Sequence, residues 1–272
     1  MVIRKTMLLL GVALSLGAAA ADKEKAPAPW KEPATGMEFV RIPKGCFLMG
    51  NLKAVKFREE FVGLPLSFED FPFNDELPQH EVCVDAFWMG RVEVRADQWQ
   101  RVMGGAAKRP DAPVANVTWE QANAFAAKLT ERTGGKYRFR LPTEAEWEYA
   151  CRAGAKDEIV PRQGELGDRA WYGIEPRGLQ NETQPVGKLA ANAFGLHDML
   201  GNVWEWVQDS YQPDGYGSHG LFDPRVEANT PNRVIRGASY RSQPLHVRCA
   251  KRAYYDAGDT LNTIGLRLVR TQ

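Results

Sequence analysis

The chain has 272 residues, with 35 Lys and Arg against 34 Asp and Glu, which gives a formal net charge of +1. A charge this close to zero argues against a nucleic-acid partner, because general nucleic-acid binders need a basic surface. Charged residues make up 25% and apolar residues 44% of the chain. This is the composition of a folded globular protein, and it excludes a disordered one.

The first 21 residues have the layout of a secretory signal peptide. Arg4 and Lys5 supply positive charge, Leu8–Gly17 is apolar, and Ala18–Ala21 provides the small residues typical of a cleavage site. The apolar run is too short to span a bilayer. We therefore expect a periplasmic or secreted protein that loses residues 1–21 and does not insert into the membrane afterwards. A short buried helix at the N-terminus is the alternative.

Residues 22–36 are polar and rich in proline, which predicts a linker or a loosely docked N-terminal arm. The globular domain is then expected to span residues 37–272. The chain has four cysteines. In an oxidising compartment this even number suggests disulfides, with three possible pairings.

Alternation of apolar and polar residues predicts strands at Met37–Pro43, Gly45–Gly50 and Glu81–Arg91. Between them, Leu52–Gln79 is a long irregular segment with five phenylalanines. A segment this long inside a compact domain is either functional or held by packing, and its aromatic residues favour packing.

Two helices have clear start signals. Thr118 and Gln121 form a capping box, after which apolar residues recur at the spacing of one helix face. Thr143 and Glu146 repeat the same device. A third, weaker helix is predicted at Ala96–Met103.

Beyond Gly154, glycine, proline and asparagine recur every few residues up to Pro231. Only short strands fit there and beyond, at Val234–Arg236, His246–Ala250 and Gly265–Val269. There is no fixed repeat and no break in composition. The sequence therefore predicts one α+β domain, rich in loops, with short strands and two or three helices.

Seven sequence blocks occur in an order that resembles one known family: GCFLMG at 45–50, PQHEV at 78–82, PVANVTW at 113–119, RLPTEAEWEYACRAG at 140–154, NAFGLHDMLGNVWEW at 192–206, RGASY at 236–240 and IGLR at 264–267. The chain resembles the formylglycine-generating enzyme family, also called the sulfatase-modifying factor family, over nearly all of residues 37–272. The resemblance implies that family's fold, a variant of the C-type lectin fold with little regular structure.

The resemblance also implies an activity, the oxidation of a sulfatase cysteine to formylglycine with O₂ and copper. Two cysteine thiolates hold the copper in such enzymes, and thiolates suit Cu(I). The first of them follows the block that matches Arg236–Tyr240. In this sequence Ser242 stands at that place, and the second position has no cysteine. A hydroxyl cannot replace a thiolate, so we expect a member without the catalytic cysteine pair and without copper.

The same resemblance suggests how the cysteines pair. By its context Cys249 resembles the family's structural cysteine, whose partner matches Cys151. Cys46 and Cys83 remain for a second bridge, and they lie on two adjacent predicted strands. A free, reactive Cys249 is the alternative.

In the resembling enzymes the block that matches residues 198–205 holds a structural calcium ion. The matching positions are Asp198, Gly201, Val203 and Glu205, with the two middle residues contributing carbonyl oxygens. Calcium takes such a mixture of carboxylates and carbonyls. Alternatively, the two acids cap turns or pair with arginines.

A substrate cleft is also implied, because the residues that match Trp204 and Ser239 line the cleft of the resembling enzymes. An enzyme with a different site would use Trp204, Ser239, Arg241 and His246 around the same cleft. The chain's four histidines have no HxH or HxxxH spacing, so we expect them to be scattered over the surface and loops.

The leading hypothesis is an exported, non-catalytic binding or regulatory protein, a pseudoenzyme of this family. Its partner would be another envelope protein or periplasmic domain, for example in type VI secretion upstream of a threonine kinase. The first alternative is a periplasmic oxidoreductase of the same family, such as one that matures a siderophore chromophore. The second is a copper-dependent formylglycine-generating oxidase with Cys249 as a ligand.

Overall fold

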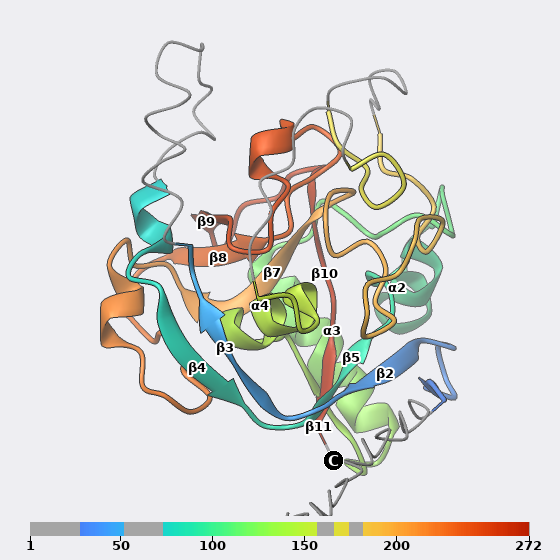
Figure 1. Cartoon of the computed structure of the whole chain (residues 1–272). Coiled ribbons are helices and arrows are strands. Elements are labelled where there is room, and N and C mark those ends of the chain that lie inside the picture. The colour runs from blue at the N-terminus through green and yellow to red at the C-terminus, as the bar shows by residue number, and fades with distance from the viewer. Residues whose placement is uncertain (1–27, 52–72, 157–165, 174–181, 272) are drawn as a thin grey trace, which may run out of the picture.

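The computed structural model describes residues 28–51, 73–156, 166–173 and 182–271. Within these ranges the strands form three sheets, of five, four and two strands, with short helices between them (Figure 1). The strands are β1 (Trp30–Lys31), β2 (Glu38–Ile42), β3 (Gly45–Met49), β4 (His80–Val84), β5 (Phe87–Gly90), β6 (Arg138–Arg140), β7 (Trp204–Ser210), β8 (Asn232–Arg236), β9 (Arg252–Asp256), β10 (Ile264–Leu266) and β11 (Val269–Thr271). The helices are α2 (Ala96–Met103), α3 (Trp119–Arg132) and α4 (Glu144–Arg152), with 3₁₀ turns η2 (Phe73–Glu76), η3 (Gly215–Ser218) and η4 (Pro244–His246).

The five-stranded sheet, in the order β1-β2-β5-β11-β6, joins the two ends of the described chain. β11 pairs antiparallel with both β5 and β6, so the last strand lies inside this sheet. At the edge, Trp30 of β1 lies opposite Phe39 of β2 and packs against Tyr137, with 4.8 Å between ring centroids. Trp30 and Lys31, within the predicted arm at 22–36, thus form strand β1, and the aromatic rings bury one another at the edge of this sheet.

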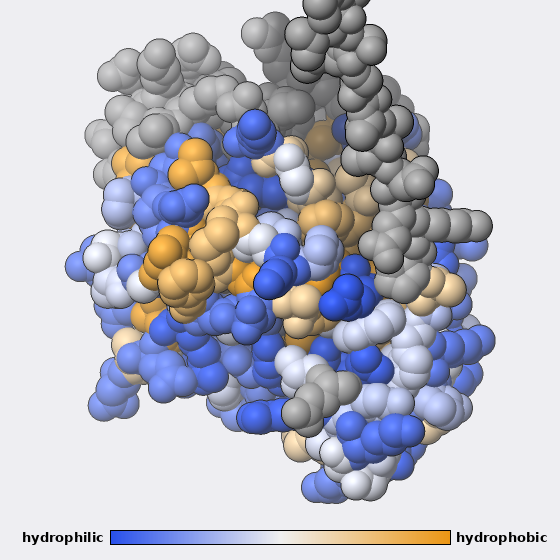
Figure 2. All heavy atoms as spheres, turned by 60° about the horizontal axis from the view of Figure 1, so that its bottom comes forward, coloured by the Kyte–Doolittle hydropathy of each residue, from blue (hydrophilic) through white to orange (hydrophobic). Residues whose placement is uncertain are grey.

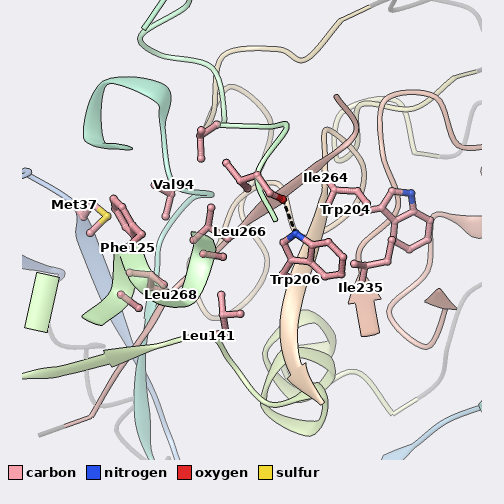
Figure 3. Packing of buried hydrophobic residues seen from close by; sticks show 14 of the residues in the cluster. Met37, Val94, Phe125, Leu141, Trp204, Trp206, Ile235, Ile264, Leu266 and Leu268 are labelled. Carbon is pink, nitrogen blue, oxygen red and sulfur yellow. Dashed lines mark hydrogen bonds between the residues drawn. The ribbon is translucent and has the colours of Figure 1, made fainter. Parts of the chain in front are cut away.

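The four-stranded sheet, in the order β10-β7-β8-β9, contributes two buried tryptophans, Trp204 and Trp206, to the core. Figure 3 shows Trp204 and Trp206 of β7 packed among Ile235, Ile264 and Leu266. The indole N–H of Trp206 donates to the backbone carbonyl of Val117 at 2.9 Å, so the ring is buried without leaving its polar atom unpaired.

The three predicted helices are confirmed. Thr118 caps α3, and Thr143 caps α4 with its hydroxyl oxygen 3.1 Å from the Glu146 N–H nitrogen. Helix α4 contacts β3, β4, β7 and β8 and lies at the centre of the view in Figure 1. All nine of its residues are buried, so its polar side chains need partners inside the protein.

Those partners are arginines. Glu144 of α4 pairs with Arg252 at 2.8 Å and with Arg236 at 3.2 Å, and Glu148 pairs with Arg236 at 2.5 Å and with Arg152 at 2.7 Å. Burial alone would raise the pKa of both glutamates, but the guanidinium charges outweigh it and hold both below the ordinary value. This buried network ties α4 to β8 and β9.

Two disulfides use all four cysteines of the chain. Cys46–Cys83 joins β3 to β4, and Cys151–Cys249 joins the end of α4 to the segment before β9. Both predicted pairings are confirmed, and no cysteine is free.

The strand predictions needed three corrections. Gly265–Val269 falls on two strands, β10 of the four-stranded sheet and β11 of the five-stranded sheet. Glu81–Arg91 is two strands, because the chain turns at Asp85, whose N–H donates to the Asp223 carboxylate, so that β4 pairs with β3 and β5 with β2. His246–Ala250 is not a strand, because Pro244 starts the 3₁₀ turn η4 there. Of the long segment Leu52–Gln79, residues 52–72 lie outside the described chain.

One face of the molecule is mostly hydrophilic, with apolar residues gathered to the left of centre (Figure 2). Large apolar side chains that are exposed among the described residues include Leu48, Leu221, Phe222 and Tyr254. None of the helices in the described ranges has both the length and the apolar character that a membrane crossing requires.

Candidate functional site

Two of the family-like blocks meet through their backbones. The N–H of Gly201 donates to the Gly237 carbonyl at 2.7 Å, and the N–H of Tyr240 donates to the Asn202 carbonyl at 2.8 Å. Gly201 has a φ of +83°, and a Cβ atom there would lie 2.0 Å from the carbonyl oxygen of Trp171. Only glycine fits this position, since both the backbone angle and the close approach exclude a side chain.

Next to this junction, two serine hydroxyls lie in one tight turn. Ser242 Oγ accepts a hydrogen bond from the Ser239 N–H at 3.0 Å, and the two hydroxyl oxygens are 3.3 Å apart. Ser239 Oγ accepts the Arg241 N–H at 3.2 Å. Both serines are buried. The hydroxyls hold the turn together at the place where the resemblance puts a thiolate.

These residues do not fit a copper site of the thiolate type. Copper(I) needs soft sulfur ligands, and each cysteine of this chain is bonded to another cysteine. Cys249, the alternative ligand, is bonded to Cys151.

The four candidate cleft residues differ in exposure. Arg241 is exposed, and its guanidinium carbon lies 5.4 Å from the centre of the Tyr240 ring. Ser239 is 1% exposed and His246 is fully buried. Trp204 is 2% exposed and packs in the core (Figure 3). Ser239 and Arg241 are hydrogen-bonded to each other in the turn, whereas Trp204 packs in the hydrophobic core.

The predicted calcium ligand Asp198 has an unusual carboxylate. Its Oδ2 accepts the Gly187 N–H at 2.6 Å, while Oδ1 is buried and has no hydrogen-bond partner within the described chain. Burial raises the pKa of this group. A buried carboxylate oxygen without a donor is costly, so this atom fits the first ligand of a cation.

Glu205, the other predicted carboxylate ligand, has different partners. Its Oε1 accepts the Arg267 Nη2 at 2.8 Å, and its Oε2 accepts the Trp147 indole N–H at 2.7 Å. The pairing with an arginine was the alternative that the sequence left open. Gly201 and Val203 lie in the intervening turn, where backbone carbonyls are the oxygens they offer.

Glu93 lies beside the same turn and was not recognised from the sequence. It is fully buried and accepts the Asn202 side-chain N–H at 2.9 Å and the Val203 N–H at 3.3 Å. Burial raises its pKa well above the ordinary value, and the charges of Asp198 and Glu205 add to the effect. An acid between two valines, Val92 and Val94, is the signal that the sequence offers.

Three carboxylates thus act on Arg267 through their charge, and Glu205 alone of them pairs with it directly. A bound cation would neutralise the excess negative charge. Within the described ranges, no three His, Cys, Asp or Glu side chains are arranged to hold a metal ion together. Of the predicted ligands, Asp198 has one oxygen without a partner among the described residues, and Gly201 and Val203 offer only backbone carbonyls. Calcium accepts such a mixture.

Two of the histidines expected to be scattered form a pair. His80 Nε2 and His219 Nδ1 are 3.1 Å apart, and His80 Nδ1 lies 2.8 Å from the Pro78 carbonyl oxygen. Burial lowers the pKa of His219 to about 4, so this ring is neutral at pH 7. The prediction of scattered histidines is wrong for this pair, because residues 139 positions apart meet only in the fold.

Comparison with known proteins supports the family. A model of the sulfatase-modifying factor enzyme 1-like domain matches residues 25–272. The formylglycine-generating enzyme of Streptomyces coelicolor is 37% identical over 164 residues, which are 55% of this chain and 49% of that protein. The inactive C-alpha-formylglycine-generating enzyme 2 of Mus musculus is 31% identical over 200 residues, 69% of this chain and 57% of that protein. The chain spans about half the length of the curated relatives it matches.

The fold agrees with a solved structure. PvdO from Pseudomonas aeruginosa has a TM-score of 0.75 and 26% identity, covering 92% of this chain and 100% of that chain. The predicted α+β, loop-rich fold is confirmed by this likeness. The chain therefore belongs to the family of sulfatase-modifying factor enzyme 1-like proteins, which includes the formylglycine-generating enzymes.

Proposed function

We propose that this protein is an exported member of its family that binds a partner and lacks the copper oxidase chemistry. The use of cysteine carries this proposal: all four residues are in disulfides, and Ser242 lies beside Ser239 where a thiolate would be needed. Two disulfides are typical of exported proteins. The similarity to a relative named inactive supports the same conclusion.

The first test is chemical. The purified protein is incubated with copper, O₂ and a cysteine-containing sulfatase peptide, and the peptide is analysed by mass spectrometry for the aldehyde. We expect no aldehyde and no free thiols in the protein, whereas the Streptomyces coelicolor relative serves as the positive control. Aldehyde formation, or two free thiols with stoichiometric copper, would refute the proposal.

The partner would be another envelope protein or periplasmic domain. In the most specific form of this proposal, the protein itself is an accessory factor of type VI secretion that acts upstream of a threonine kinase, by the resemblance described above. Arg241 is the exposed side chain among the candidate residues, so it is the natural position for partner contact.

This role is tested by photo-crosslinking in cells. A crosslinker is placed at Arg241 and, as a matched control, at Lys128, an exposed position on α3. We expect a discrete crosslinked product from position 241 alone. Equal products from both positions, or none from position 241, would contradict partner binding at this turn.

We also propose a structural calcium ion held by Asp198 with the carbonyls of Gly201 and Val203. The buried, unbonded Oδ1 of Asp198 supports it. Adding calcium after chelation should raise the Tm of the native protein and leave that of an Asp198→Asn variant unchanged. An Asp168→Asn variant, changed at an exposed position, should respond like the native protein. Equal responses from all three proteins would exclude this site.

A second candidate is an oxidoreductase with a different site, which the likeness to PvdO over 92% of this chain favours. It would use Ser239, Arg241 and His246, and its substrate would be a siderophore chromophore. Oxygen consumption on adding such a chromophore, lost in Arg241→Ala, would favour this candidate over the binding protein.

A further inference from the structure

A cavity of about 450 Å³ lies away from the turn at Ser239, between β1, β2, helix α2 and the loop at 186–197. Its wall includes none of the four candidate cleft residues. Its volume falls in the range of small-molecule sites. Apart from His197, the residues that line it carry no aromatic ring, which disfavours an apolar ligand.

The lining is cationic. Lys31, Arg91, Arg95 and Arg101 all line the cavity, and Glu38 is the acid among the described residues of its wall. These four basic side chains come from β1, the end of β5 and helix α2. Segments that are distant in the sequence therefore place their positive charges around one cavity.

The arginines are held in place by carboxylates. Asp97 accepts Arg95 at 2.8 Å and Arg101 at 2.9 Å, and Arg101 also donates to the Thr35 carbonyl at 2.7 Å. Glu38 accepts Arg91 Nη1 at 2.9 Å. Lys31 makes no ion pair with the described residues. Because the guanidinium groups are already oriented, a ligand would order few further side chains on binding.

Two more acids touch this wall from behind, and both have their own donors. Glu32 is buried and accepts the N–H groups of Ala34 and Thr35. Asp198 accepts the N–H of Gly187, a residue of the wall. Neither carboxylate is part of the wall itself, where four basic side chains face one acid, Glu38.

We propose that this cavity binds a small ligand that carries a carboxylate or phosphate group. Arginine presents planar pairs of N–H donors that match the oxygens of both groups. Arg91 retains Nε and Nη2, and Arg95 retains Nη1, beyond the ion pairs described. The site is independent of the proposed loss of copper chemistry.

The test uses calorimetric titration of the full protein with two probes, inorganic phosphate and citrate. We expect at least one of them to bind, with a Kd that rises with salt because the contacts are electrostatic. Binding of one probe alone identifies the group that the ligand carries.

Variants locate the site. Arg95→Gln with Arg101→Gln should raise the Kd about tenfold or more. Lys31→Gln, which breaks no ion pair, should raise it several-fold without changing the Tm. Arg225→Gln removes an arginine whose described partner is Glu227, outside the cavity, and should leave the Kd unchanged. The proposal is overturned if neither probe binds the native protein, or if Arg225→Gln weakens binding as much as Lys31→Gln.

Discussion

Asp209 offers the sharpest test of how burial and charge act in this fold. It lies on β7, fully buried, where its Oδ2 accepts the Glu144 N–H and its Oδ1 accepts the Val226 N–H, both at 2.8 Å. Burial raises its pKa from 3.8 to about 7, and the charge of Glu144 adds to the effect. The perturbation is Asp209→Asn, which removes the titration and keeps the shape.

The magnitude follows from the raised pKa. The unfolded chain loses this proton near pH 4, whereas the folded protein keeps it until about pH 7. The stability that Asp209 contributes is therefore fully present below about pH 4, falls as pH rises, and is gone above about pH 7. Each pH unit of this window is worth about 1.4 kcal/mol, so the total is about 4 kcal/mol.

The Asp209→Asn variant does not titrate at this position, so its stability does not fall in this way as the pH rises. At low pH it should be less stable than the native protein by about 1–3 kcal/mol, because an amide oxygen replaces two acceptors and one N–H loses its partner. By about pH 8 it should equal or exceed the native protein, because only the native protein then carries the buried charge.

The assay is urea unfolding of both proteins at a series of pH values, followed by tryptophan fluorescence. An exposed Asp168→Asn variant should give a stability curve parallel to that of the native protein. If the Asp209→Asn curve is also parallel across this range, the carboxylate does not carry a raised pKa and the reasoning fails.

Other changes test the remaining structure. Glu148→Gln should lower the free energy of unfolding by about 3–5 kcal/mol, because two buried arginines lose a charged partner; an exposed Glu120→Gln should have little effect, and equal losses would argue against the network. Replacing Cys151 and Cys249 together by serine should cost about 4–5 kcal/mol in urea unfolding, since the bridge spans 98 residues; an unchanged midpoint would contradict this. Gly201→Ala should lower the Tm by several degrees, because its Cβ would strike a backbone carbonyl; an unchanged Tm would show that the turn is not tight.

The helices were predictable because their signals are local. A capping box such as that of Thr143 and Glu146 satisfies its hydrogen bonds within four residues, so the sequence displays it directly. Strand β7 was missed for the opposite reason. Six of its seven residues are buried, and these include the acids Glu205 and Asp209, so the polar residues do not mark a solvent-facing side of the strand. Strand β9 was also missed.

In the candidate site, too, the local contacts could be predicted from the sequence and the long-range contacts could not. The neighbouring hydroxyls of Ser239 and Ser242 follow from a spacing of three residues. The partners of the 198–205 turn could not be predicted from such a spacing. Glu93 is 109 positions from Asn202, and Arg267 is 62 positions from Glu205. No local pattern specifies such contacts.

The interlocked turn at Gly201 bears on how relatives of this protein are recognised. The glycine excludes a side chain because the Trp171 carbonyl occupies that space, and Gly237 similarly has Trp147 against it, 3.0 Å from where a Cβ would lie. The blocks that contain these glycines thus record steric fit between loops. A sequence identified through them shares an architecture, while the reaction, if any, depends on the few residues that this architecture leaves free to vary.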